Sequence, residues 1–247
     1  MNPRATPLGG CSAVAVVGGI ATCTTSDLGI GAHTIAAAYN GDVDHLRSQG
    51  SHVLTVTRLP STTTITVSST TITYGASATL TATVSVVDQN APGTVTFTAG
   101  GSPLCTAGVS TTKVATCTVT WSALGTFSVG ATFSGGGAVA GSVAPHVVIT
   151  IQRDVATVQL SVTTLKVGAT SAVTLIARVQ PSEGSGTVAF LKGLTSLKGC
   201  TAVAMTTAGF AQCRTVLTTK GTTTFTARFS GSPHIAPAQT SIKTTIH

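Results

Sequence analysis

Apolar and polar residues alternate with a period of two along most of the chain. Over positions 78–86 the even positions carry Ala, Leu or Val, and the odd positions carry Thr or Ser. The segments 94–98 and 127–133 alternate in the same way. Because successive side chains of a strand point to opposite faces, this pattern predicts half-buried β-strands. No segment shows a helical period, so the predicted fold class is all-β.

Three segments bounded by cysteines are related in sequence, at positions 11–23, 105–117 and 200–213. Their first cysteines recur at intervals of 94 and 95 residues. Each segment is followed by a glycine and an alternating stretch, beginning at Gly31, Gly125 and Gly221. A period of this length exceeds any solenoid repeat and matches one small all-β domain. The sequence therefore predicts a tandem repeat.

Two of the three copies are complete, at 59–151 and 152–247, with about seven strand-like runs each. An apolar face on every strand requires a second sheet to bury it, which predicts two-sheet sandwiches. The first copy, 1–58, has counterparts of only about the last four strands. Within this copy alone, Ile35, Ala37 and Tyr39 would have no opposing sheet.

The segment that follows Met1, MNPRATPLGG, lacks the apolar stretch of a secretion signal. We interpret the chain as the tail of a longer protein or as the product of a clipped gene model. No run of residues approaches the ~18 apolar residues that a membrane helix needs. We therefore expect no membrane span.

Threonine replaces charge as the source of surface polarity in this chain. Only 8% of the 247 residues are charged, whereas 49 are Thr. Thr is β-branched and favours strands, and its hydroxyl keeps an outward face hydrated. This composition argues against a helical protein and against disorder driven by high charge.

The six cysteines form three local pairs, each spanning a short loop between two strand-like runs. We predict the disulfides Cys11–Cys23, Cys105–Cys117 and Cys200–Cys213, formed between facing residues of hairpins. Zinc is the alternative, but two thiols per copy supply only half of a structural site. Buried free thiols would not explain why cysteine recurs in pairs. Disulfides imply an oxidising, extracellular location.

Two motifs carry a family resemblance that extends over essentially the whole chain. They are the stretch GAHTIAAAYNGDVDHLRS at 31–48 and the strand G-T-V-x-F at 93 and 186. The chain resembles the bacterial immunoglobulin-like domains of group 3, tandem modules of bacterial surface and secreted proteins. The later copies have lost the acidic residues of the turn, at 134–137 and 230–233. The resemblance implies immunoglobulin-like β-sandwiches, an extracellular spacer or adhesin-like role, and no catalytic activity.

The residues themselves suggest no catalytic site, metal or cofactor. Only six carboxylates are present, and none forms a repeated pair. Asp42 and Asp44, with His45 nearby, could contact a divalent cation, but calcium requires six to eight oxygens. We favour a turn in which Asn40 and Asp42 satisfy local backbone groups. The six histidines share no spacing, and His33 is interpreted as a tolerated residue at a strand start.

The two junctions between copies are short. The sequence LPST at 59–62 resembles a sortase signal, but Thr63 follows in place of Gly and a full copy comes after it. We interpret it as a linker, and Arg153 and Asp154 occupy the equivalent later junction. Short linkers predict a semi-rigid, monomeric rod.

The net charge of +7 comes from the last copy, which contains nine Lys and Arg residues and only two acidic residues. A basic surface could attract an anionic cell-wall polymer, and the alternative is a solubility device. Arg178 and Arg228 should point outward from opposite sheets, which spreads the charge around the domain. Nucleic acid is not expected, because the basic residues lack surface aromatics for stacking.

The leading hypothesis is a non-catalytic extracellular structural spacer of a bacterial surface or secreted protein, with adhesion as a further role. One alternative is a module that binds carbohydrate or cell-wall polymer, for which Trp121 and Tyr74 are the only aromatic candidates. Another is an accessory region of a larger secreted enzyme. Candidate partners are a cell-wall polymer, a glycan, or the surface of a host or other cell.

Overall fold

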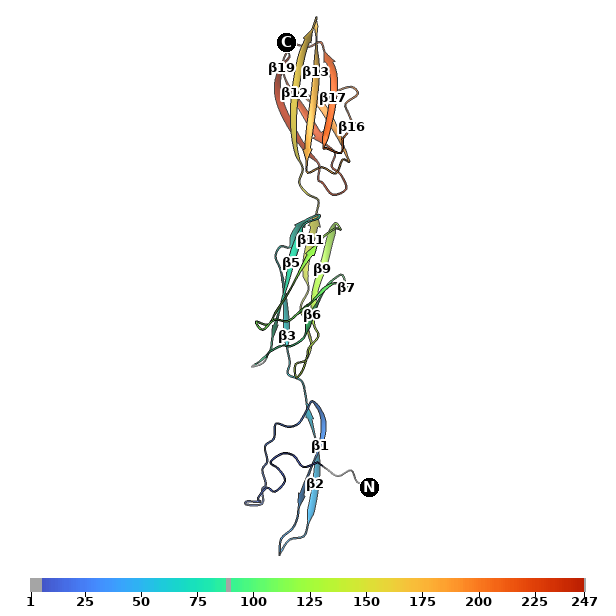
Figure 1. The fold of residues 1–247 in the computed structure, drawn as a ribbon. Helices are drawn as coiled ribbons and strands as arrows, with labels where there is room; N and C mark the ends of the chain where they lie inside the picture. The colour runs from blue at the N-terminus through green and yellow to red at the C-terminus, as the bar shows by residue number, and fades with distance from the viewer. Residues whose placement is uncertain (1–5, 88–89, 247) are drawn as a thin grey trace.

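A computed structural model describes residues 6–87 and 90–246 of the chain. Residues 1–5 of the N-terminal segment discussed above lie outside the described residues. All regular structure in the described ranges is β-strand, and three parts of the chain follow one another end to end (Figure 1). Within these ranges the structure has no helix that is long and apolar enough to cross a membrane.

The middle part of the chain is a sandwich of two sheets. One sheet is formed, in spatial order, by β3 (Thr62–Val67), β5 (Ser77–Ser85) and β8 (Val114–Thr120). The other is formed, in spatial order, by β4 (Thr71–Thr73), β11 (Val147–Gln152), β9 (Gly125–Phe133), β6 (Thr94–Ala99) and β7 (Ser102–Gly108), and β10 (Ser142–Val143) pairs with β9. All neighbours are antiparallel except β4 and β11.

The alternation in sequence determines which side chains form the core of this sandwich. Leu80 and Val84 of β5 are fully buried against apolar residues of the other sheet, including Phe97 of β6 and Phe133 of β9. Threonines occupy the outward faces and pair across strands, as between the hydroxyls of Thr79 and Thr118 at 3.3 Å. These pairs hydrate the surface without charge.

The C-terminal part repeats this arrangement. One sheet contains β12 (Thr157–Val167), β13 (Thr170–Gln180) and β17 (Phe210–Leu217). The other contains β15 (Thr195–Ser196), β14 (Thr187–Lys192), β18 (Gly221–Phe229) and β19 (Ala238–Ile246), and β16 (Val203–Ala204) pairs with β14. The order β14-β18-β19 corresponds to β6-β9-β11 of the middle sandwich, which confirms the predicted class of immunoglobulin-like β-sandwiches.

The N-terminal part contains only β1 (Gly31–Tyr39) and β2 (Ser48–Val56), paired antiparallel. The expectation of about four strands was wrong: residues 6–30 form no strand, only an isolated bridge between Val17 and Ile20. In the middle sandwich the corresponding strands β7 and β8 pair with β6 and β5. Residues 1–58 have no sequence counterpart of β5 or β6, so the cysteine segment has no strand to pair with.

Candidate functional site

The disulfide Cys105–Cys117 joins the two sheets of the middle sandwich. Cys105 lies on β7, which pairs with β6, and Cys117 lies on β8, which pairs with β5 in the opposite sheet. Their Cα atoms are 6.6 Å apart. The expectation that the cysteines face each other within a hairpin was wrong, because the chain crosses between the sheets after β7. The bond therefore connects the two layers.

The other two disulfides lie in different settings. Cys213 is buried on β17, and its partner Cys200 lies in the loop after β15. The backbone carbonyl of Cys200 accepts a hydrogen bond from the Phe190 amide on β14, at 2.9 Å, so this bond too connects opposite sheets. Cys11 and Cys23 close the strandless loop of the N-terminal part. No free cysteine remains among the described residues.

The linker at Leu59 is hydrogen-bonded into the sandwich that follows it. The Leu59 amide donates to the carbonyl of Ala138 at 2.8 Å, and the Ala140 amide donates to the carbonyl of Leu59 at 2.8 Å. The Ser61 hydroxyl also donates to the carbonyl of Ala140, at 2.7 Å. The LPST segment thus begins the middle sandwich.

The second linker has the same geometry. The Asp154 amide donates to the carbonyl of His234 at 2.8 Å, and the Ala236 amide donates to the carbonyl of Asp154 at 2.8 Å. Leu59 forms an isolated parallel bridge to the loop after β9, and Asp154 forms one to the corresponding loop after β18. Both linkers are therefore anchored by backbone pairing at the entry to a sandwich.

A side-chain cluster connects the middle and C-terminal sandwiches at this second junction. The ring of Tyr74, which follows β4, stacks on the ring of His234 with centroids 3.7 Å apart and planes 9° apart. Nδ1 of His234 donates to a carboxylate oxygen of Glu183 at 2.8 Å. The other oxygen of Glu183 accepts from the Ser232 hydroxyl at 2.6 Å. We refer to Tyr74, Glu183, Ser232 and His234 as the junction cluster.

The electrostatics of the junction cluster favour an ionised carboxylate. The Ser232 hydroxyl, and after it the hydrogen bond from His234, hold the pKa of Glu183 below its ordinary value of 4.5. The side chains of His234 and Glu183 are 37% and 29% exposed. The cluster is therefore partly solvated, and its evident role is to fix the position of the ring that stacks on Tyr74.

Sequence reasoning did not identify Glu183 or His234 as functional residues. A signal was present in the repeat: His234 occupies the position of Ala138 in the middle copy, and Glu183 occupies that of Asn90. Both positions lie in loops at the entry end of a sandwich. A copy-specific polar residue at such a position, as His234 is in place of Ala138, would have indicated a contact with the preceding unit.

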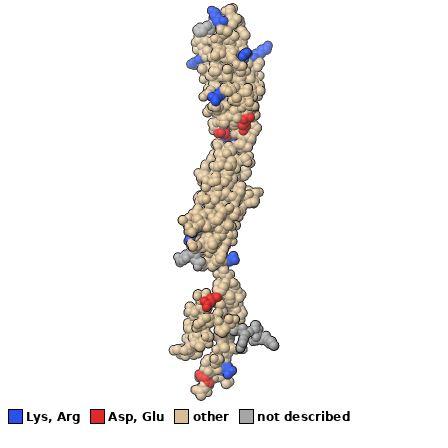
Figure 2. All heavy atoms as spheres, viewed as in Figure 1, with Lys and Arg blue, Asp and Glu red and all other residues tan. Residues whose placement is uncertain are grey.

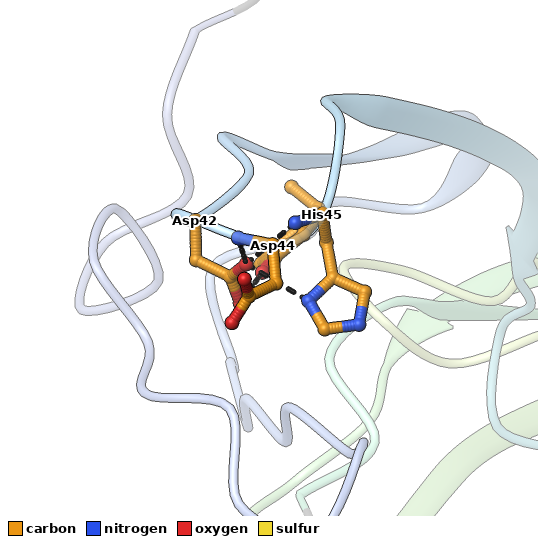
Figure 3. A network of polar contacts seen from close by, with 4 residues as sticks. Asp42, Asp44 and His45 are labelled. Carbon is orange, nitrogen blue, oxygen red and sulfur yellow. Dashed lines mark hydrogen bonds and ion pairs between the residues drawn. The ribbon is translucent and has the colours of Figure 1, made fainter.

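Within the expected turn, the carboxylate of Asp42 satisfies local backbone groups (Figure 3). One carboxylate oxygen of Asp42 accepts from the amides of Asp44 and His45, at 2.9 and 2.7 Å, and from Nδ1 of His45 at 2.8 Å. The other oxygen accepts from the Tyr39 hydroxyl at 2.6 Å. The Tyr39 bond, followed by that from His45, lowers the pKa of Asp42 to about 2. The described residues contain no group of three potential metal ligands.

Residues 65–152 match the model of the bacterial Ig-like domain, group 3. The matched range spans nearly all the strands of the middle sandwich, from β3 to β11. The middle sandwich is a bacterial Ig-like domain of group 3. No curated protein matches the chain.

Several solved structures resemble the chain of Ig-like sandwiches. The fibronectin(III)-like modules of Clostridium thermocellum CbhA share 18% identity, over 74% of this chain and 93% of that chain, with a TM-score of 0.30. The Yersinia pseudotuberculosis adhesin InvE shares 16% identity, over 75% of this chain and 58% of that chain, with a TM-score of 0.31. The ICAM-5 D1–D4 ectodomain fragment shares 16% identity, over 88% of this chain and 61% of that chain, with a TM-score of 0.39. The chain spans less than two thirds of the length of the InvE and ICAM-5 chains. Structural similarity with such low identity and TM-score carries no information on activity or partner.

The two aromatic candidates for a glycan platform are both engaged within the Ig-like chain. Trp121 is 5% exposed and packs against Phe127, with ring centroids 5.5 Å apart. Tyr74 stacks on His234 in the junction cluster. Trp121 is therefore buried in the core, and one face of the partly exposed Tyr74 ring is occupied by His234.

The basic residues are dispersed over the C-terminal sandwich (Figure 2). Arg178 on β13 and Arg228 on β18 are exposed on opposite sheets. The Arg178 guanidinium lies over the ring of Phe210, 5.7 Å from its centroid, and Nε of Arg228 donates to Gln239. These two cations are thus engaged by neighbours on their own sheets.

The histidine at the start of β1 has a local partner. Nε2 of His33 donates to the carbonyl of Gly29 at 2.7 Å, within the same segment of the N-terminal part. The interpretation of His33 as a residue tolerated at a strand start stays a prediction.

Proposed function

We propose that this chain is a non-catalytic extracellular spacer of a bacterial surface or secreted protein, built from Ig-like domains at 59–151 and 152–247 and a partial one at 1–58. The observation that carries the proposal is the anchoring of both linkers. Leu59 and Asp154 are each held by two backbone hydrogen bonds at the entry to a sandwich. A chain without free linkers keeps its modules extended, which is what a spacer requires.

The disulfides support the extracellular location. Each of the three units carries one bond, and two of them connect opposite sheets. Such bonds form and persist in oxidising compartments and are reduced in the cytosol. A module that depends on them for stability is suited to the exterior of the cell.

The polar chemistry of the described residues supports a non-catalytic role. Two of the acidic groups, Asp42 and Glu183, have lowered pKa values and accept hydrogen bonds from neighbouring donors. A general acid or base needs a pKa near the working pH and access to substrate. Neither carboxylate meets the first condition.

The spacer role is favoured over the binding of carbohydrate or cell-wall polymer. The candidate aromatic rings are committed to the core and to the junction cluster. Basic residues of the C-terminal sandwich lie on both of its sheets, as Arg178 and Arg228 do, and this distribution is suited to solubility. A spacer of this kind serves equally in an adhesive surface protein and in the accessory region of a secreted enzyme.

The proposal is tested by the distance between the two complete sandwiches in solution. Spin labels at Thr66→Cys on β3 and Gln159→Cys on β12, both exposed positions, would report this distance. We expect a single narrow distribution. A control chain with a Gly/Ser insertion of about ten residues between Gln152 and Arg153 should give a broad one. A distribution in the parent chain as broad as that of the control would overturn the spacer proposal.

A further inference from the structure

The disulfides of the two complete sandwiches differ in their exposure to solvent. Cys200 and Cys213 are only 3% and 2% exposed and belong to the core of the C-terminal sandwich. Cys105 and Cys117 are both half-buried, at the margin of the core of the middle sandwich. The two bonds occupy corresponding places in the repeat. Their difference in burial therefore comes from the local structure of each copy.

The Cys105–Cys117 bond lies on an open side of its sandwich. Cys105 pairs with Phe97, and Cys117 pairs with Leu80. Because paired residues share a face of the sheet and both partners are fully buried, the two cysteine side chains point between the layers. β7 and β8 are each the last strand of their sheet, and among the described residues no further strand pairs with either outer edge. The bond therefore spans the gap between two edge strands.

In the C-terminal sandwich a turn draws the bond into the core. The Cys200 amide donates to the carbonyl of Leu197 at 3.0 Å, and the Phe190 amide donates to the carbonyl of Cys200 at 2.9 Å. Leu197 and Met205, which flank this cysteine along the chain, are buried and belong to the same core cluster. The corresponding stretch of the middle copy, 102–108, is the regular strand β7, which leaves Cys105 at the margin.

Charge by itself would favour attack on the buried bond. Thiol reductants react as thiolate anions, which a neighbouring cation attracts. Arg214 directly follows Cys213, whereas Lys113 is the one Lys, Arg, Asp or Glu among residues 62–87 and 90–152. The Lys113 ammonium is already engaged, since it donates to the carbonyl of Val86 at 3.0 Å. Attack requires contact with a sulfur atom, so the difference in burial outweighs the difference in charge.

We propose that the Cys105–Cys117 bond is a site of thiol–disulfide exchange with an external dithiol, which reduces it in the folded chain while Cys200–Cys213 stays oxidised. A thiolate of the dithiol bonds to one sulfur of the pair, the S–S bond breaks, and its electron pair leaves with the other cysteine as a thiolate. The second thiol of the reductant then displaces the first cysteine and closes a disulfide within the reductant. The two electrons and the two protons on the final thiols come from the dithiol.

This exchange changes what holds the two layers of the middle sandwich together. In the oxidised chain a covalent bond links β7 to β8 across the layers. In the reduced chain the layers are held by apolar contacts, among them those of Leu80 and Phe97. The middle sandwich therefore acquires a redox-dependent stability that the C-terminal sandwich does not share.

The test uses the full chain in native buffer, with dithiothreitol as the reductant, timed alkylation of the thiols and mass spectrometry. Lys113 lies between Cys105 and Cys117, so trypsin separates these two cysteines and reports the state of their bond. We expect Cys105–Cys117 to be reduced at least about tenfold faster than Cys200–Cys213. Equal rates, or faster reduction of Cys200–Cys213, would overturn the proposal.

Urea below the unfolding transition distinguishes direct attack from attack after unfolding. A bond that reacts in the folded chain should be reduced at a rate that urea leaves almost unchanged. A buried bond reacts only after an opening that exposes surface, so its rate should rise with urea. We expect the first behaviour for Cys105–Cys117 and the second for Cys200–Cys213. An equally steep rise for both bonds would mean that reduction requires unfolding, and the proposal would then be wrong.

The matched variant is Met205→Ala, which removes a buried side chain from the core cluster around Cys200. We expect faster reduction of Cys200–Cys213, with a weaker dependence on urea, because the bond becomes accessible without a large opening. The rate for Cys105–Cys117 should stay the same, since that bond lies in the other sandwich. If the variant left the rate for Cys200–Cys213 unchanged, burial would not be what separates the two bonds, which contradicts the proposal.

Discussion

Cys105 and Cys117 are bonded to each other although they belong to opposite sheets of the middle sandwich. The two layers are otherwise held by apolar contacts between residues such as Leu80 and Phe97, which are fully buried. A covalent link between the layers limits their separation in the unfolded chain and restrains any sliding in the folded one.

Removal of this link should destabilise the middle sandwich. We expect the double variant Cys105→Ala/Cys117→Ala to lose about 3 kcal/mol of unfolding free energy, because a closed loop of this size restricts the unfolded chain by that amount. The measurement is the thermal midpoint by calorimetry, which should fall by several degrees. The matched control, Cys11→Ala/Cys23→Ala, lies in the N-terminal part and should leave that midpoint unchanged. An unchanged midpoint in the first variant would contradict the role assigned to the bond.

Gly93 should be intolerant of any side chain. Its φ is +149°, and an added Cβ atom would lie 2.6 Å from the carbonyl oxygen of Gly135 and 2.8 Å from the Phe133 ring. We expect Gly93→Ala to cost about 2 kcal/mol or more in denaturant titrations. Gly108→Ala is the control, since nothing lies within 4 Å of the point that its Cβ atom would occupy, and its φ is ordinary. Similar effects of the two substitutions would argue against close packing as the cause.

His234 should control the order of the junction between the two complete sandwiches. We expect His234→Ala to remove the stacked contact with Tyr74 and to broaden the distance distribution between spin labels on the two sandwiches. The unfolding midpoint of the C-terminal sandwich should change little in comparison. His52→Ala, at an exposed position on β2, is the control and should leave the distribution narrow. If both variants give the same distance distribution, the contact between His234 and Tyr74 does not order the junction.

The Glu183 carboxylate should give the C-terminal sandwich a dependence on acid pH. Its pKa in the folded chain is lower than its ordinary value of 4.5, chiefly because of the bond from Ser232 and also because of that from His234. A depressed pKa means that the stabilisation is present above about pH 4.5 and is lost as the pH falls through the folded value. We expect the thermal midpoint of this sandwich to decrease as the pH is lowered from about 4.5 through the folded pKa of Glu183.

The matched variant for this prediction is Glu183→Gln. Its side-chain oxygen still accepts a hydrogen bond from Ser232, but it does not titrate. The acid-induced fall in the midpoint should therefore be smaller in the variant than in the parent chain. An identical pH profile in the two proteins would show that other groups are responsible.

The class of fold and much of its chemistry could be predicted from the order of residues. Alternation over 78–86 placed Leu80 and Val84 in the core, because a strand with period two has only one face to bury. The recurrence of the cysteine segments revealed the repeat, and the G-T-V-x-F strands located β6 and β14.

The identity of neighbouring strands emerged only in the folded chain. Cys105 and Cys117 looked like a hairpin pair because they are close in sequence, but β7 and β8 pair with strands from different sheets. The cysteine segment at 11–23 has a related sequence, yet it forms no strand, because a strand requires a partner that residues 1–58 do not contain. The stacking of Tyr74 on His234 joins residues far apart in the chain. Local pattern specifies which residues can form a strand or a contact, whereas pairing is a long-range property that only the assembled sheets define.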